Sequence, residues 1–190
     1  MSKLTGVFDL FKNLDKISIE DVNANLTIKQ SPEFLQNYIA NRVIYPQTIP
    51  SKVLEMDIDL IFLKEVVKLN KDKFIDQKNK RILIPEIFFL RFTPAPKMVM
   101  AILDGLNVKD IYLIVKKGSS ATKTLGTYIA GINFTAKALQ VSVEGYKRKI
   151  SIGKAYLFPV NKADVKVMGL KDKQLNVSGG ELGIILDLRK

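Results

Sequence analysis

The chain has 190 residues, of which 47% are hydrophobic, and a formal net charge of +11. It contains no histidine, cysteine or tryptophan, which excludes an imidazole base, a thiolate nucleophile, a disulfide and a Cys/His zinc site. No apolar run reaches the roughly 18 residues that a membrane-spanning helix needs, and the N-terminus has no signal-peptide pattern. We therefore expect a cytoplasmic globular protein that uses no cofactor and no metal.

The positive charge is uneven along the sequence. Residues 1–100 hold 15 Lys and Arg against 12 Asp and Glu, whereas residues 101–190 hold 15 against 7. This asymmetry indicates an anionic partner for the C-terminal half. A general lysine bias, as in proteins of AT-rich genomes, would raise the charge without any function, so the sequence leaves both interpretations open.

The N-terminal segment, residues 3–17, has the pattern of an amphipathic helix. Its apolar residues recur at steps of three and four, which places them on one face: Leu4, Val7, Phe8, Phe11 and Leu14. Such a face can dock on a partner or close the domain's own core, and these five residues are our partner-binding candidates. The charges around the face are of mixed sign, which disfavours a membrane-surface helix.

The first half of the chain is predicted to be α/β. Ser31-Pro32-Glu33 is typical of a helix start, and a second helix is expected from Ser51 to about residue 69. Its expected core stripe is Val53, Met56, Leu60, Leu63 and Val67. A charged loop over 71–80, a buried strand over 81–90, a helix from Thr93-Pro94 to Gly105 and a strand over 111–115 should follow. Strand, helix and strand in this order predict a parallel βαβ unit.

From residue 125 onward the apolar period changes to two. Residues 139–143 alternate between apolar and polar, and Gly145-Tyr146 suits a two-residue hairpin turn. Further short strands are expected over 155–160, 164–167, 175–178 and 182–188. About 65 residues of short strands and glycine turns predict a small all-β barrel or sandwich. We place the domain boundary between residues 120 and 121.

Three motifs could bind anions or metals. The run Ser178-Gly179-Gly180-Glu181-Leu182-Gly183 is followed by a strand pattern and not by a helix, so we interpret it as a hairpin turn and not a phosphate cradle. Asp57 and Asp59 are two residues apart on a helix and therefore share no face for a metal. Lys147, Arg148 and Lys149 beside the hairpin turn are the anion-binding candidates, with Tyr128, Tyr146 and Tyr156 as possible stacking residues.

Four stretches, in order, resemble the C-terminal part of the glutamate mutase accessory protein family (GlmL, also called MutL, unrelated to mismatch repair). They span residues 41–50, residues 92–96 leading to 103–106, residues 125–127, and the glycine-rich run over 177–189. The last is the most specific, and the resemblance covers roughly residues 31–190. It implies that 31–115 derive from the second lobe of an actin-like ATPase and 125–190 from a β-rich extension.

The departures from the family pattern concern ATP. The family's first lobe, with the main phosphate-binding hairpin, has no counterpart, and its closing Arg-Gly-Arg-Pro run is shortened to Arg189-Lys190. Where the adenosine loop should have a Gly-Gly pair, this chain has Ile87-Phe88. Glycines would let the backbone approach a nucleotide, whereas Ile and Phe fill that space. The resemblance thus implies a degenerate lobe, a pseudo-ATPase kept as a scaffold.

The sequence therefore predicts a non-catalytic scaffold or assembly subunit that acts through protein–protein contacts. No motif places a base beside a Ser, Thr or Tyr hydroxyl, so no nucleophile is predicted. We expect a homo-oligomer or a larger protein complex, because a lobe without its partner lobe leaves a surface uncovered. The alternative is a basic nucleic-acid-binding protein that uses the C-terminal β-domain.

Overall fold

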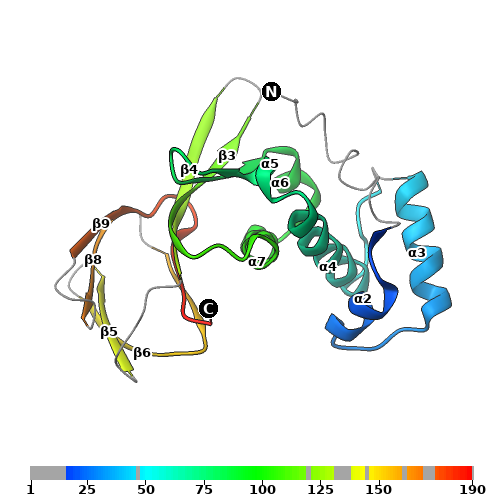
Figure 1. The fold of residues 1–190 in the computed structure, drawn as a ribbon, viewed down its shortest axis with the longest axis horizontal. Helices are drawn as coiled ribbons and strands as arrows, with labels where there is room; N and C mark the ends of the chain where they lie inside the picture. The colour runs from blue at the N-terminus through cyan, green and yellow to red at the C-terminus, as the bar shows by residue number, and fades with distance from the viewer. Residues whose placement is uncertain are drawn as a thin grey trace. The chain divides into compact units, whose positions relative to one another are not determined.

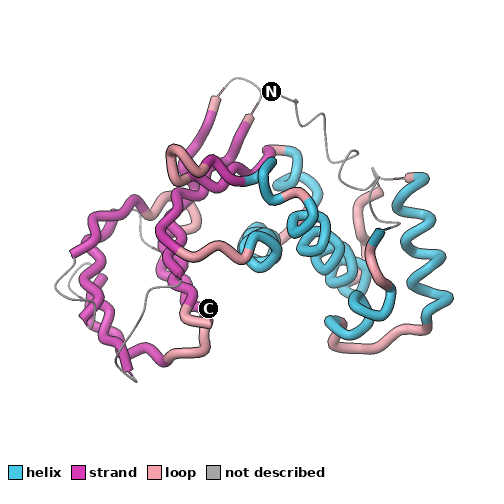
Figure 2. Tube along the Cα trace, viewed as in Figure 1, coloured by secondary structure: helices cyan, strands magenta, loops and turns pink. Residues whose placement is uncertain are grey.

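The computed structural model describes residues 16–45, 48–118, 121–130, 138–143, 146–159, 162–168 and 174–189. For 138–143, 146–149, 162–168, 174–176 and 178 it describes the backbone only. The chain forms two compact units. The first combines the residues up to 74 with 85–107, and the second combines 75–84 with the residues from 108 onward. The described helices lie in the first unit, and the strands of a mixed sheet lie in the second (Figure 2). The expected α/β class is confirmed.

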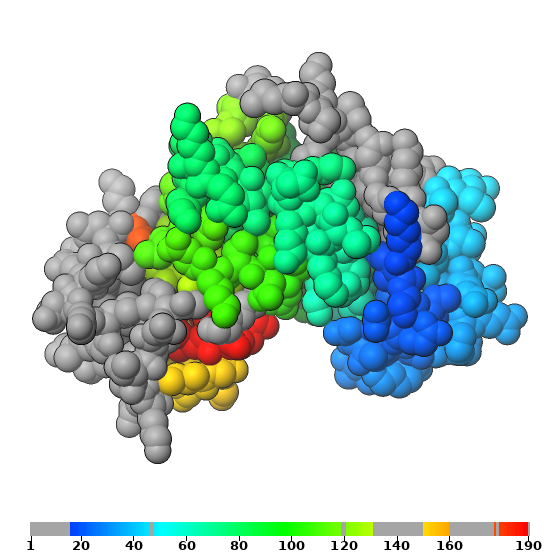
Figure 3. Space-filling view, viewed as in Figure 1, coloured from blue at the N-terminus to red at the C-terminus, as the bar shows by residue number. Residues whose placement is uncertain are grey.

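The first unit is a bundle of helices in which α4 is central (Figure 1). Its elements are α2 (Ile19–Asn25), α3 (Pro32–Ile44), α4 (Val53–Leu69), α5 (Lys71–Phe74), α6 (Ile87–Arg91) and α7 (Ala95–Leu106). α4 contacts α2, α5 and α7, and α2 also contacts α3; the side chains of α2 and α3 lie side by side in Figure 3 (dark to light blue). The helix start at Ser31 is confirmed, because its hydroxyl accepts a hydrogen bond from the Phe34 N–H at 3.2 Å.

α4 buries part of the stripe that the sequence pattern predicted: Leu63 and Val67 are buried, whereas Met56 and Leu60 are half-buried. Its buried residues are Ile58, Asp59, Phe62, Leu63, Val66 and Val67, while Val53 is 72% exposed. The buried residues therefore do not follow a regular spacing of three and four residues counted from Val53. Ser51 does not cap the helix with its hydroxyl; instead its N–H and hydroxyl donate to the Glu55 carboxylate at 2.9 and 3.3 Å.

α7 packs closely on α4 and passes through Gly105. A Cβ built on Gly105 would lie 2.3 Å from the carbonyl oxygen of Lys64, so glycine is required by the approach of the two helices. The prediction that Gly105 ends the helix was wrong, because the helix ends one residue after it. Asn107, at φ 48°, is the left-handed cap, and its N–H donates to the Leu103 carbonyl at 3.0 Å.

The second unit contains two sheets. The six-stranded sheet has the order β1-β2-β3-β4-β10-β7, formed by β1 (Ile75–Asp76), β2 (Arg81–Pro85), β3 (Asp110–Lys117), β4 (Thr122–Ala130), β7 (Ala155–Phe158) and β10 (Gly183–Asp187). The four-stranded sheet has the order β6-β5-β8-β9, formed by β5 (Ala138–Val143), β6 (Tyr146–Ser151), β8 (Lys162–Met168) and β9 (Gln174–Ser178). β9 also contacts β4 and β10 of the larger sheet.

The glycine-rich run joins the two sheets. Gly183 pairs with Gly126 in the parallel ladder of β10 and β4, and Leu182 N–H donates to the Leu125 carbonyl at 2.7 Å. A Cβ on Gly183 would lie 1.9 Å from the Phe158 carbonyl oxygen, and Gly183 has φ +73°. The strand predicted after the glycines is confirmed, but the turn is not a hairpin, because β9 and β10 belong to different sheets.

Several predicted boundaries change in the structure. The strand expected over 81–90 ends at Pro85, which has no N–H for the ladder, and the chain continues as helix α6. The loop expected over 71–80 contains α5 and β1. β5 pairs with β6 so that Val143 faces Tyr146; Tyr146 thus belongs to strand β6 and not to the predicted turn, while Gly145 lies outside the described residues.

The division into units also differs from the predicted boundary at residues 120 and 121. β3 and β4 lie on either side of that position and are neighbouring antiparallel strands of one sheet. β2 and β3 are neighbours in the same sheet and are separated in sequence by α6 and α7, as in the expected strand–helix–strand order. The β-rich part therefore begins before residue 121 and is not a separate all-β module.

Candidate functional site

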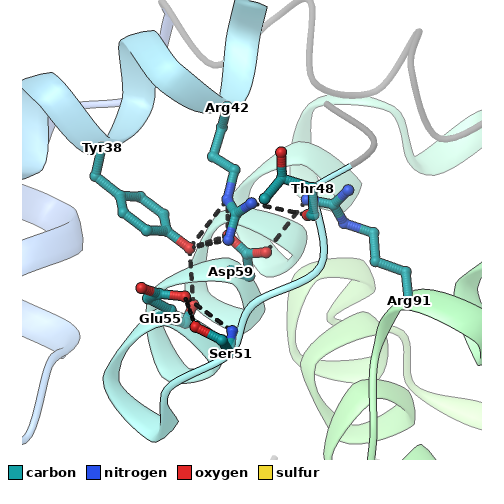
Figure 4. A network of polar contacts seen from close by, with 7 residues as sticks. All are labelled: Tyr38, Arg42, Thr48, Ser51, Glu55, Asp59 and Arg91. Carbon is teal, nitrogen blue, oxygen red and sulfur yellow. Dashed lines mark hydrogen bonds and ion pairs between the residues drawn. The ribbon is translucent and has the colours of Figure 1, made fainter. Parts of the chain in front are cut away.

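A network of buried charges lies inside the first unit, centred on Asp59 of α4 (Figure 4). The side chain of Asp59 is 0% exposed, and two arginines reach it: Arg42 from α3 and Arg91 from α6. Both guanidinium groups are also buried. Burial of three ionised groups costs free energy unless they pair and form hydrogen bonds with one another. Their contacts therefore decide whether the site is structural or can bind a ligand.

Arg42 contacts three elements at once. Its Nε donates to Asp59 Oδ1 at 3.1 Å, and its Nη1 donates to the carbonyl oxygen of Thr48 at 2.7 Å. Its Nη2 donates to the Tyr38 hydroxyl at 2.6 Å, and the guanidinium lies 4.8 Å from the centre of the Tyr38 ring. Arg42 thus fixes the segment that connects α3 to α4, which Figure 4 shows passing close to the guanidinium.

The Tyr38 hydroxyl links the arginine to the carboxylate. It lies 2.8 Å from Asp59 Oδ1 and 3.1 Å from the Glu55 carbonyl oxygen, so its single proton is donated to the nearer acceptor. Burial, and then the negative charge of Asp59, raises the pKa of Tyr38 far above its usual value. The phenol is therefore neutral at every physiological pH and acts as a hydrogen-bonding spacer.

The network contains two cations and one anion. Arg91 Nη2 lies 3.2 Å from Asp59 Oδ2, while burial raises the pKa of Asp59 against the opposing effect of both arginines. The hydrogen bonds of Arg42 are made within the protein, to Tyr38, Thr48 and Asp59. This arrangement suits a structural clamp better than an anion-binding site.

The clamp supports an exposed apolar surface at the junction of α3 and α4. We call this surface the apolar corner; it consists of Val43, Ile44, Tyr45, Ile49 and Val53, all of them exposed. The Thr48 N–H donates a hydrogen bond to the Tyr45 carbonyl at 3.1 Å, and Arg42 donates one to the Thr48 carbonyl. The hydrogen bond from Arg42 therefore fixes the backbone beside these exposed apolar side chains.

A shallow groove of about 470 Å³ runs between α4 and α7 in the same unit. Leu60, Ile61, Met100 and Ala101 form its apolar part, and Lys97 and Asp57 face each other at 3.9 Å on its rim. In the described part of the chain, no group of three or more Asp and Glu residues could hold a metal ion. The residues that line the groove include no Ser, Thr or Tyr hydroxyl that could act as a nucleophile.

The sequence-predicted site residues have different outcomes. Leu4, Val7, Phe8, Phe11 and Leu14 lie outside the described residues, so their docking role stays a prediction. Lys147, Arg148 and Lys149 lie in β6, where the backbone is described, opposite Ser142, Val141 and Gln140 of β5. Successive residues of a strand belong to opposite faces, so the register places Arg148 on one face of the sheet and the two lysines on the other.

The stacking role suggested for Tyr128 was wrong. Tyr128 is fully buried in β4, and its hydroxyl lies 3.1 Å from Asp187 Oδ2. Asp187 is itself buried and pairs with Arg189 through both carboxylate oxygens, at 2.9 and 2.8 Å. A tyrosine inside this polar contact of the larger sheet cannot meet a nucleobase.

The buried network was missed by sequence reasoning. Asp59, Arg42 and Arg91 were visible as single charges inside otherwise apolar runs, which was the available signal. Their partners lie 17 and 32 residues apart in sequence, and no local pattern connects them.

The chain matches no protein-family model, no curated protein and no solved structure significantly. None of the helices that the structure describes is long and apolar enough to span a membrane.

Proposed function

We propose that this protein is a non-catalytic assembly subunit that associates with further copies of itself through the apolar corner. The observation that carries the proposal is the exposure of five large apolar side chains within residues 43–53, including Ile49 at 63% and Val53 at 72%. Large exposed apolar surfaces mark protein contact sites, and these five residues are close together in the sequence. The clamp formed by Arg42 and Asp59 keeps the corner in one conformation, which lowers the entropy cost of association.

A second copy fits the corner because the surface is uncharged. An apolar patch is complementary to itself, and two copies related by a twofold axis bury the same residues on both sides. Lys52 and Glu55, on either side of Val53 in the sequence, have opposite signs and would pair across such an axis. The resemblance to an accessory protein family agrees with an assembly role, and the proposal does not depend on it.

The absence of catalysis rests on side-chain chemistry. Asp59 pairs with the two arginines in the clamp, and the Tyr38 phenol stays protonated. Phe88, at the position where the resembled family has a glycine, is fully buried between Phe74 and Phe92, with ring centres 6.0 and 5.8 Å away. An aromatic residue committed to the core supports the inference that this segment no longer receives a nucleotide.

The proposal is tested by the mass of the particle in solution. Light scattering after size exclusion should show an oligomer for the parent chain, and Ile49→Asp with Val53→Asp should shift the protein to the monomer, because each change puts a charge into a dry contact. Ile28→Asp is the matched control, since Ile28 is 69% exposed but lies outside the corner. A parent chain that is monomeric at high micromolar concentration, or a control that dissociates equally, contradicts the proposal.

A further inference from the structure

The net positive charge of the protein lies entirely in the second unit. The first unit has 12 Lys and Arg against 12 Asp and Glu, and the second has 18 against 7, a net +11. A general lysine bias would raise the charge of both units. The charge is therefore a property of the second unit, and a positive face there is expected to meet an anionic partner.

The register of the four-stranded sheet separates its residues into two faces. β6, β5, β8 and β9 pair antiparallel in a continuous register, so residues directly opposite each other share a face. One face is nearly all apolar and includes Val141, Val143, Val165, Val167 and Leu175. The other contains Lys147, Lys149, Lys162 and Lys166, together with Gln140, Ser142, Gln174 and Asn176. We call this second face the lysine face.

Burial is described for two neighbouring residues at the end of β6. Ile150, on the apolar face, is 1% exposed, whereas the next residue, Ser151, is exposed and belongs to the lysine face. Among the described positions of the lysine face, Asp164 is the one acidic residue. Arg148 belongs to the opposite face, so the basic run 147–149 does not act as a unit.

The lysines form a two-dimensional array. Lys147 and Lys166 occupy one row of the sheet, separated by Ser142 of β5. Since neighbouring strands are about 4.8 Å apart and alternate residues about 7 Å apart, the backbone of Lys147 is roughly 7 Å from that of Lys149 and roughly 10 Å from that of Lys166. Lys162 lies four residues from Lys166 along β8, roughly 14 Å away. Such spacing allows successive charges of one flexible polyanion to be neutralised together.

We propose that the lysine face binds single-stranded nucleic acid through its phosphates, without base recognition. Lys, Ser, Asn and Gln are residues that contact phosphate and sugar oxygens, and such contacts carry no sequence information. The described positions of this face include no aromatic residue on which a base could stack. This activity is independent of the apolar corner, which belongs to the first unit.

The test uses the full chain and a fluorescent oligothymidine of about 20 nucleotides, with anisotropy measured between about 50 and 200 mM salt. Four phosphate contacts predict a slope of log affinity against log salt of about −2.8. The triple variant Lys147→Gln, Lys149→Gln, Lys166→Gln should lose roughly 2 units of that slope and at least about tenfold in affinity at the lowest salt.

The control variant removes the same charge from the same unit. Lys78, Lys109 and Lys154 are exposed and lie outside the four-stranded sheet, and changing all three to Gln should leave the slope nearly unchanged. Thermal melts should show that both triple variants are folded. Equal losses in the two variants, or no binding by the parent chain at 50 mM salt, would overturn the proposal. Displacement of the oligonucleotide by polyglutamate as readily as by unlabelled oligothymidine would also overturn it, and would indicate an acidic protein partner.

Discussion

Asp59 and Asp57 lie two residues apart on α4 and have opposite environments. Asp59 is fully buried between two arginines, whereas the Asp57 side chain is 41% exposed and faces Lys97 at 3.9 Å. The sequence predicted correctly that they share no face. It could not predict that Asp59 would be the centre of a polar core, because that depends on where α3 and α6 pack.

Asp59→Asn should lower the free energy of unfolding by about 3 kcal/mol, because two buried arginines would lose their anion. Asp57→Asn, on the same helix, should change it by less than about 0.5 kcal/mol, because its contact is weak and solvent-screened. Urea denaturation followed by circular dichroism measures both. Similar values for the two variants would show that the clamp does not hold the first unit together.

At the level of elements, the contact between β4 and β10 explains why two distant motifs contain glycine. Gly126 and Gly183 are paired, and a Cβ on Gly126 would lie 2.3 Å from the Gly183 carbonyl oxygen. The sequence indicated a turn and a strand at 178–188, and both exist. It could not indicate that the strand pairs in parallel with residues 126–130, because register across more than 50 residues leaves no periodic signal.

Gly183→Ala should destabilise the protein by more than about 3 kcal/mol, since the new methyl group would meet the Phe158 carbonyl and the backbone has a positive φ. Gly153→Ala is the control: Gly153 has φ +89° but nothing within 4 Å of a built Cβ. Its cost should be about 1 kcal/mol, the strain of the left-handed conformation alone. If both substitutions cost the same in urea denaturation, close packing at Gly183 is not what requires glycine.

The segment 81–91 shows where local patterns fail. Its residues are mostly apolar, with charges at Arg81, Glu86 and Arg91, and a continuous strand was predicted over 81–90. Pro85 ends the ladder, and Phe88 then packs against Phe74 and Phe92 within the helical unit. Local sequence cannot distinguish a buried strand from a short buried helix, so the change of element at residue 86 depends on tertiary packing.

At the scale of the whole molecule, we expect no ATP binding by this chain. Phe88 occupies the core where the resembled family has a glycine, and moving it would open a large cavity. Calorimetric titration with Mg-ATP should give no heat beyond dilution at millimolar nucleotide. Saturable binding with a micromolar dissociation constant would contradict this expectation. It would indicate that the chain has kept the nucleotide binding of the family that it resembles.

The two units differ in net charge and in their exposed apolar side chains. The first has zero net charge and an apolar corner, and the second has the entire +11. Counting charge by halves of the sequence detected this division in part, because residues 75–84 join the second unit and 101–107 join the first. The rest of the charge separation depends on which segments fold together in each unit, which the order of residues along the chain does not show.

The most direct measurement of the central claim is chemical crosslinking at the corner. The chain has no cysteine, so Ile49→Cys introduces a single thiol into it, and Ile28→Cys provides an equally accessible control. We expect a short bis-maleimide to convert Ile49→Cys largely to a covalent dimer at low micromolar protein and to leave Ile28→Cys monomeric. Equal crosslinking of both variants, or none at Ile49→Cys, would contradict assembly through the apolar corner.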